Sequence, residues 1–358
     1  MQDFKKEFPV LHKYTYLNTA YSGLMHNSLI EWRRNHDLAY LNNGSLFRDN
    51  HHNTTEEIRK SAGSFFNCNE ACVALVPNFS YAFNTVLAGL APRRKVLLLK
   101  NDYPNVNEPF ERGDFEIVYA EINENLEENI YQAITTSQPE IFAFSIVQYI
   151  NGIKIDLDFL RKLKEDFPNL LIIADGTQFL GTAVFDFENS GIDIIGASAY
   201  KWLLAGYGNG FMLFKKEIVP LLFTQSFKKV APTEFSKTQE HLMNHFEPGH
   251  LNSLSLGSLG HSLQFLITIG QENITAKLMK LSHIAKEKFT EHNLLETKVL
   301  LRKTHSTIFN IKGDKEVFNR LKAKNILCSL RGDGIRVSFH FYNSEKDIEG
   351  LLTCLKNS

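Results

Sequence analysis

The sequence has little cysteine. Only four of the 358 residues are cysteine, scattered as Cys68, Cys72, Cys328 and Cys354, which argues against a disulfide framework. Cys68 and Cys72 are four residues apart and could share one face of a helix, but no second cysteine or histidine pair at metal spacing accompanies them. We therefore expect buried free thiols and no metal site.

Excess charge and long apolar runs are missing too. Lysine plus arginine (39) balances aspartate plus glutamate (40), so neither a nucleic-acid partner nor an acidic membrane surface is indicated. No apolar stretch approaches the roughly 20 residues of a membrane span, and the first ten residues lack the apolar core of a signal peptide. We expect a soluble, cytoplasmic protein without membrane partners.

A nicotinamide-type glycine motif is also lacking. No G-x-G-x-x-G turn follows the first apolar run, and the glycines at 206, 208 and 210 precede a strand instead of a helix. The chain nevertheless has the means to fold compactly, because 43% of its residues are hydrophobic and 22% are charged. Its length predicts two domains.

The stretch 170–214 is the centre of the sequence. Three apolar runs of strand length, 170–174, 192–197 and 211–214, are typical of strands buried on both faces of a parallel sheet. Asp175 directly follows the first run, and Lys201 follows the second. Open α/β sheets place ligands at the carboxyl ends of their strands, so we expect this carboxylate and this amine in one site.

Strands and helices alternate from 70 to 214, which predicts a mostly parallel sheet covered by helices. Beyond residue 260 the pattern predicts long polar helices, of which 271–292 is the clearest, then two strands around 298–311 and a helix over 314–324. We expect an α/β large domain over 15–235, and a smaller α+β domain made of 1–14 plus 236–358.

The pattern Asp-x-x-Gln at 175–178, Ser-x-x-Lys at 198–201 and a glycine-rich turn resembles class V of the pyridoxal-phosphate (PLP) enzymes, of fold type I. That class includes aminotransferases, cysteine desulfurases, kynureninase-like lyases and isopenicillin N epimerase-like proteins. The resemblance implies that Asp175 keeps the cofactor's pyridine nitrogen protonated and that Lys201 forms the Schiff base. A buried carboxylate suits the first role, and a desolvated amine of lowered pKa suits the second.

The resemblance also implies further contacts with the cofactor. They comprise a phosphate seat, a stacking ring, amides near the phenolic oxygen, and a loop from the other subunit of a homodimer. In that order the residues are Phe79, Ser80, Ser198 and Tyr200; Tyr103; Gln148 and Gln178; and His250 in the loop 245–252. Ser80 is equally an ordinary helix cap, and the loop equally a plain turn with a surface histidine.

The closing segment 330–348 resembles the class V substrate motif, in which an arginine binds the α-carboxylate of an amino-acid substrate. Arg336 takes that role by position, and a guanidinium matches a carboxylate with two parallel hydrogen bonds. Asn151 and Ala20 are weaker substrate candidates. Arg331 either assists Arg336 or pairs with Asp333 on the surface.

The resemblance does not fix the reaction. Desulfurases carry a nucleophilic cysteine on a loop between the two arginine positions, whereas here only Gly-Asp-Gly-Ile separates Arg331 from Arg336. Cys328 lies before Arg331, so persulfide chemistry is disfavoured. We expect a class V aminotransferase acting on an amino acid. A PLP-dependent lyase, desulfurase or epimerase is one alternative, and a scaffold without activity is another.

Overall fold

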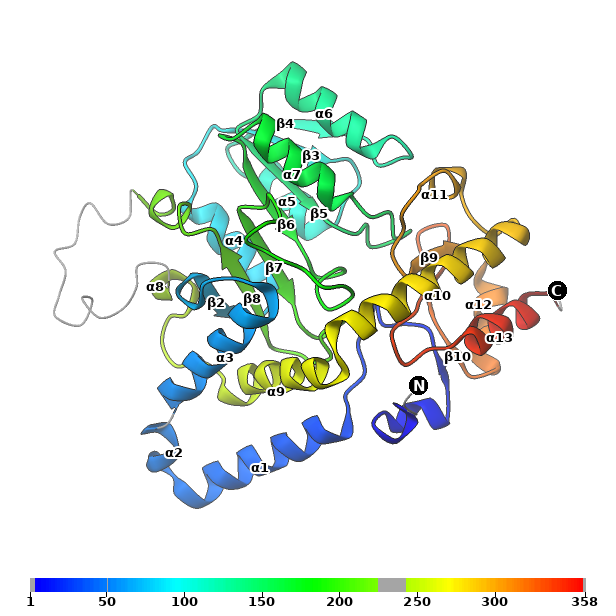
Figure 1. Ribbon diagram of the computed structural model, residues 1–358, viewed down its shortest axis with the longest axis horizontal. Helices are drawn as coiled ribbons and strands as arrows, with labels where there is room; N and C mark the ends of the chain where they lie inside the picture. Colours follow the sequence, from blue (N-terminus) through cyan, green and yellow to red (C-terminus); the bar gives the residue numbers. More distant parts are fainter. Residues whose placement is uncertain (1–3, 50, 225–242, 357–358) are drawn as a thin grey trace.

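The computed structural model describes residues 4–49, 51–224 and 243–356 (Figure 1). Its main sheet has the strand order β2-β8-β7-β6-β5-β3-β4, in which β8 runs opposite to the other six strands. This confirms the predicted α/β fold with a mostly parallel sheet. The strands are β2 Val73–Val76, β3 Lys95–Leu99, β4 Glu116–Ala120, β5 Ile141–Ser145, β6 Leu171–Asp175, β7 Ile194–Ser198 and β8 Gly210–Phe214.

The centre of this sheet is buried on both faces. Every residue of β5, β6, β7 and β8 is buried, as their continuous apolar runs predict. Edge strand β4 is half exposed, which explains why apolar pattern alone did not predict it. The helices of this part are α1 Asn27–Asn43, α2 Ser45–Asp49, α3 His51–Phe66, α4 Phe79–Gly89, α5 Pro104–Glu111, α6 Leu126–Ser137 and α7 Leu157–Asp166.

A second, smaller body contains the carboxyl-terminal elements that follow α9 (Figure 1). Its antiparallel sheet has the order β11-β12-β9. The elements from the middle of the chain onward are α8 Met243–Phe246, α9 Ser253–Ile269, α10 Gln271–Glu291, α11 Thr297–Leu300, β9 Ile308–Ile311, α12 Lys315–Ala323, β10 Ile326–Leu327, β11 Ser329–Arg331, β12 Gly334–Ser338 and α13 Glu345–Lys356. Short 3₁₀ turns cover Phe4–Lys6, Pro9–His12, Glu70–Cys72 and Val219–Leu221.

The prediction of two strands around 298–311 was wrong in its first half. Residues 297–300 form the short helix α11, and β9 alone is extended. A single helical turn explains the apolar run, because it buries Val299 and leaves Leu301 60% exposed. Consecutive apolar residues at this length do not distinguish a strand from a helical turn.

The amino-terminal segment 15–23 joins the two bodies. β1 Thr15–Tyr16 pairs in parallel with β10, and the Leu17 carbonyl accepts a hydrogen bond from Ser338 N at 2.9 Å. Further on, Gly23 N donates to the Tyr200 carbonyl at 2.9 Å, beside Lys201. The predicted domain boundary at residue 15 stays a prediction.

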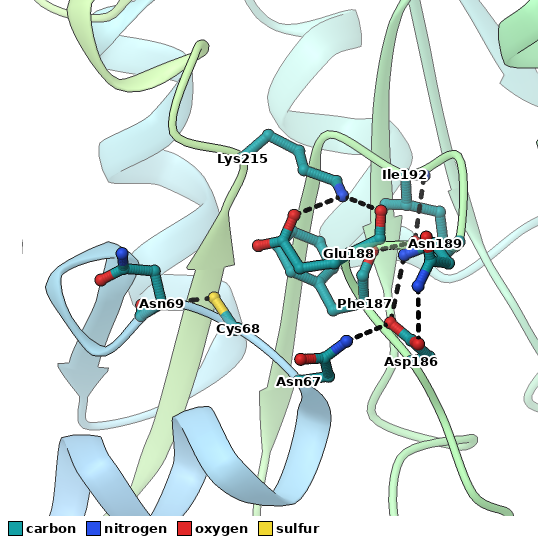
Figure 2. Close-up of polar contacts among 10 residues, drawn as sticks. Asn67, Cys68, Asn69, Asp186, Phe187, Glu188, Asn189, Ile192 and Lys215 are labelled. Carbon is teal, nitrogen blue, oxygen red and sulfur yellow. Dashed lines mark hydrogen bonds and ion pairs between the residues drawn. The ribbon is translucent and has the colours of Figure 1, made fainter.

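Polar contacts fix the amino-terminal end of β7, which is the end away from Lys201 (Figure 2). Lys215 forms an ion pair with Glu188 at 2.9 Å, and Asp186 accepts from the Asn67 amide at 2.8 Å. These contacts tie the loop before β7 to the end of α3. None of the helices in the described ranges is both long enough and apolar enough to cross a bilayer.

Candidate active site

Lys201 and Asp175 lie at the carboxyl ends of neighbouring strands. Asp175 is the last residue of β6, and Lys201 comes just after β7, with which β6 pairs. Both side chains line one pocket, and their residues are 9% and 6% exposed respectively. The arrangement follows from two buried strands that end side by side, as the sequence predicts.

Burial controls the titration of both groups. It lowers the pKa of Lys201 to about 8; the Asp175 carboxylate opposes this shift, and the charges of Arg336 and Arg331 reinforce it. Burial also raises the pKa of Asp175, while hydrogen bonds from Thr177 and the charge of Lys201 act in the opposite direction. Lys201 is therefore a free amine near neutral pH far more often than an ordinary lysine, which a nucleophilic lysine requires.

One wall of the pocket is the start of helix α4. Asn78 caps this helix by accepting from Tyr81 N, and Phe79 N donates to Ser198 Oγ at 2.9 Å. Ser80 Oγ accepts from the Asn105 amide at 2.8 Å. A helix amino terminus with two adjacent hydroxyls suits a phosphate group.

Tyrosines form the other walls. Tyr103 and Tyr149 line the pocket and pack edge to face with ring centroids 5.4 Å apart. Tyr200 stacks on Tyr207 at 4.7 Å. Burial raises the pKa of Tyr200 to about 12, with smaller contributions from its charged and phenolic neighbours, so its phenol keeps a proton that it can donate.

Arg336 is a buried cation with unused hydrogen-bonding capacity. It lies in β12, is 2% exposed, and donates from Nη1 to the Tyr149 carbonyl at 2.6 Å. Its Nε has no hydrogen-bond partner within the described residues. A buried N–H without a partner is costly, so a carboxylate ligand fits this position.

A family model, aminotransferase class V, matches residues 34–351. The chain belongs to aminotransferase class V. It is therefore a PLP-dependent enzyme, and the residues present fit the cofactor, because a carboxylate, an amine and a helix amino terminus with two hydroxyls meet in one pocket. When bound, PLP withdraws electrons from the α-carbon of an amino acid.

The relatives of this class V chain are named either as cysteine desulfurases or as aminotransferases. It is 21% identical to a probable cysteine desulfurase of Ureaplasma parvum serovar 3, over 99% of this chain and 97% of that protein. It is also 21% identical to the uncharacterised aminotransferase YcbU of Bacillus subtilis, over 97% and 95%.

Solved structures of similar fold include the cysteine desulfurase of Thermococcus onnurineus NA1, with a TM-score of 0.87, 17% identity, and coverage of 100% of this chain and 98% of that one. The cystine C–S lyase C-DES matches with a TM-score of 0.83 and 15% identity, over 97% and 98%. At these identities the structural matches establish the fold alone.

Eight of the residues that the class V resemblance singled out line the one pocket described above. They are Phe79, Ser80, Tyr103, Asp175, Gln178, Ser198, Tyr200 and Lys201. The amide of Gln178 already has two hydrogen bonds within the protein: it accepts from Trp202 Nε1 at 2.8 Å and donates to the Ala20 carbonyl at 2.9 Å. Ala20 is buried beneath this contact.

Gln148 and Asn151 lie in the turn after β5, outside the pocket lining. The Gln148 amide oxygen accepts from Ile150 N and Asn151 N at 2.6 and 3.0 Å, and Asn151 Oδ1 accepts from Ile153 N at 3.1 Å. Both side chains thus shape the turn that presents Tyr149. Their predicted contacts with cofactor and substrate stay predictions.

His250 lies outside the pocket as well. Its ring is exposed and lies 3.0 Å from Nη2 of Arg48, in α2. Its predicted contact with the cofactor of a second subunit stays a prediction.

Sequence reasoning missed four polar or aromatic residues at the strand ends. Thr177, Ser145 and Tyr149 line the pocket, and Asp102 accepts from Ser145 N and Tyr103 N, both at 2.7 Å. Burial raises the pKa of Asp102 to about 7, although these hydrogen bonds oppose the rise. The signal was available, because each of the four residues ends a buried strand or follows one closely.

Proposed function

We propose that this class V enzyme is an aminotransferase whose chemistry centres on Lys201. The observation that supports it is a buried amine of lowered pKa beside a buried carboxylate and the partly unpaired guanidinium of Arg336. Lys201 would hold the cofactor and then move a proton to and from the substrate α-carbon.

The other roles follow from position in the pocket. Asp175 would hold the ring nitrogen protonated, since a cation beside it opposes the rise that burial causes in its pKa. Phe79, Ser80, Ser198 and Tyr200 surround the expected phosphate, and Tyr103 offers a ring for stacking. These surroundings hold the cofactor and keep bulk water from the reacting carbon.

Cysteine chemistry is the less favoured reaction. All four cysteines lie in the described ranges, and none of them lines the pocket. Burial raises the pKa of both Cys68 and Cys328 to about 12, so these thiols stay protonated. Figure 2 shows Cys68 among the contacts at the opposite end of the sheet. A thiolate that could accept sulfur is therefore missing from the described part of this site.

A homodimer would complete the site. Helix α1 and the following α2 leave a row of apolar side chains exposed, among them Tyr40 (59%), Leu41 (77%) and Leu46 (66%). Such a patch on a soluble protein marks an interaction surface. His250 contacts Arg48 of α2, so a second copy seated on this surface would bring its loop close to the first.

The test is the visible absorption spectrum of the purified protein with added PLP, beside Lys201→Ala. We expect a yellow band that borohydride fixes to Lys201, that the variant lacks, and that the control Lys100→Ala keeps, because Lys100 forms an exposed ion pair with Glu121. No band at saturating PLP would overturn the proposal.

The reaction is tested on the same preparation. Amino acids with an added keto acid should yield the new amino acid and the matching keto acid. Release of sulfide and alanine from L-cysteine, without amino-group transfer, would instead establish a lyase or desulfurase. Loss of stereochemical purity without transfer would establish an epimerase.

A further inference from the structure

Two arginines project from the same face of the small sheet. In the β11–β12 hairpin Ser329 pairs with Arg336, and Arg331 pairs with Gly334. Residues directly opposite each other share a face, and alternate residues along one strand share it too. Arg331 therefore emerges on the face of Arg336, and the glycine opposite it has no side chain to cover it.

Arg331 is not neutralised by its surroundings. No ion pair to it occurs within 4–49, 51–224 and 243–356, and Asp333, which is two residues away, does not pair with it. Its guanidinium carbon lies 5.8 Å from the centroid of the Tyr149 ring, at the pocket wall. The backbone carbonyl of this same tyrosine accepts from Arg336. Tyr149 thus contacts both arginines.

The electrostatics agree with this geometry. After burial, the charge of Arg331 is the next cause that lowers the pKa of Arg336, and it also contributes to the lowered pKa of Lys201. The two guanidinium groups thus both lie next to Tyr149, a residue that lines the pocket. The α-carboxylate of an amino acid would neutralise one of them, which leaves the exposed Arg331 for a second anion.

We propose that Arg331 is a specificity-determining residue that binds a carboxylate on the substrate side chain, so that dicarboxylic amino acids are the preferred amino donors. This inference rests on the proposed aminotransferase function. The guanidinium, already held over the ring of Tyr149, loses little freedom when it binds a carboxylate. Glutamate and aspartate carry that group at the reach of one short side chain, whereas glutamine and asparagine match their shapes without the charge.

The experiment compares these four amino acids as donors for the wild-type holoenzyme and for Arg331→Gln, Arg331→Lys and Arg93→Gln. The wild type should favour glutamate and aspartate over their amides. Arg331→Gln should reduce that preference about 10- to 100-fold, the range of a hydrogen bond between charged groups. Most of the change should appear in KM, and Arg331→Lys should retain part of the preference. Arg93 forms an exposed ion pair with Asp114, and its variant should keep the wild-type preference.

Several results would overturn the inference. One is a wild-type enzyme that shows no preference for glutamate and aspartate over their amides. A second is a wild-type enzyme whose absorption spectrum does not change when any of the four donors is added. Another is an equal loss for acids and amides in Arg331→Gln, which would assign Arg331 to the α-carboxylate. Circular dichroism and the PLP absorption band show that each variant is folded and loaded. Failure of the aminotransferase proposal is distinct, because it would appear earlier, as a missing PLP band or as absent amino transfer from every donor.

Discussion

Replacing Gly23 by alanine tests whether the amino-terminal segment packs directly against the backbone of Lys201. An added Cβ at Gly23 would lie 1.9 Å from the Lys201 carbonyl oxygen and 2.8 Å from that of Tyr200. Both contacts are with backbone atoms, so no side-chain rotation relieves them. Either the segment or Lys201 must move, and Gly23 N would then lose its hydrogen bond to Tyr200.

The cost can be estimated from overpacking, which typically destabilises a core by about 1–3 kcal/mol, and we expect the upper half of that range here. Unfolding entropy of about 2.1 cal mol⁻¹ K⁻¹ per residue gives roughly 0.75 kcal mol⁻¹ K⁻¹ for 358 residues. A loss of about 2–3 kcal/mol should therefore lower Tm by about 3–4 °C. Because the backbone of Lys201 shifts, the affinity for PLP should fall as well.

The assay is calorimetry of the PLP-free protein, followed by titration with PLP. Gly350→Ala is the matched control, since Gly350 lies exposed within α13 and an added Cβ there would have no neighbour within 4 Å. That control should gain about 0.5–1 kcal/mol from helix propensity and raise Tm slightly. A Gly23→Ala protein that melts and binds PLP like the wild type would refute the close approach.

Two further predictions concern Lys201 and the dimer. Since burial lowers the pKa of Lys201 to about 8 from 10.5, PLP addition to the PLP-free protein should reach half its maximal rate near pH 8. The contribution of Lys201 to the free energy of unfolding should rise from about pH 8 to pH 10.5, because over that range the unfolded state binds more protons than the folded state. A midpoint above pH 10 in the stopped-flow rate of PLP addition would contradict the burial of Lys201. Leu41→Glu should yield a monomer by light scattering, whereas Leu301→Glu, just after α11, should remain a dimer; a wild-type monomer would refute the dimer.

The proximity of Asp175 and Lys201 could be predicted from the sequence. Fully buried strands appear as continuous apolar runs, and the ends of such runs mark the edge of the sheet where ligands bind. The contacts of the amide side chains could not be predicted in this way. Gln148 bonds to backbone within its own turn, whereas Gln178 holds residues far away in the chain. Nothing local distinguishes these uses from binding a ligand, because one amide serves all three.

Contacts between residues that are distant in sequence had no local signal at all, and they determine how the strands around the site are held together. Ala20 N donates to Ser338 Oγ at 2.9 Å, and the Ala20 carbonyl accepts from Gln178. Ser338 ends the strand that carries Arg336, while Gln178 follows the strand that ends in Asp175. Ala20 therefore links the strand of Arg336 to the strand of Asp175. A shift of the small sheet would move Arg336 relative to Lys201 only by breaking these contacts or by moving Ala20 with it, so the amino-terminal segment sets the position of Arg336 relative to Lys201.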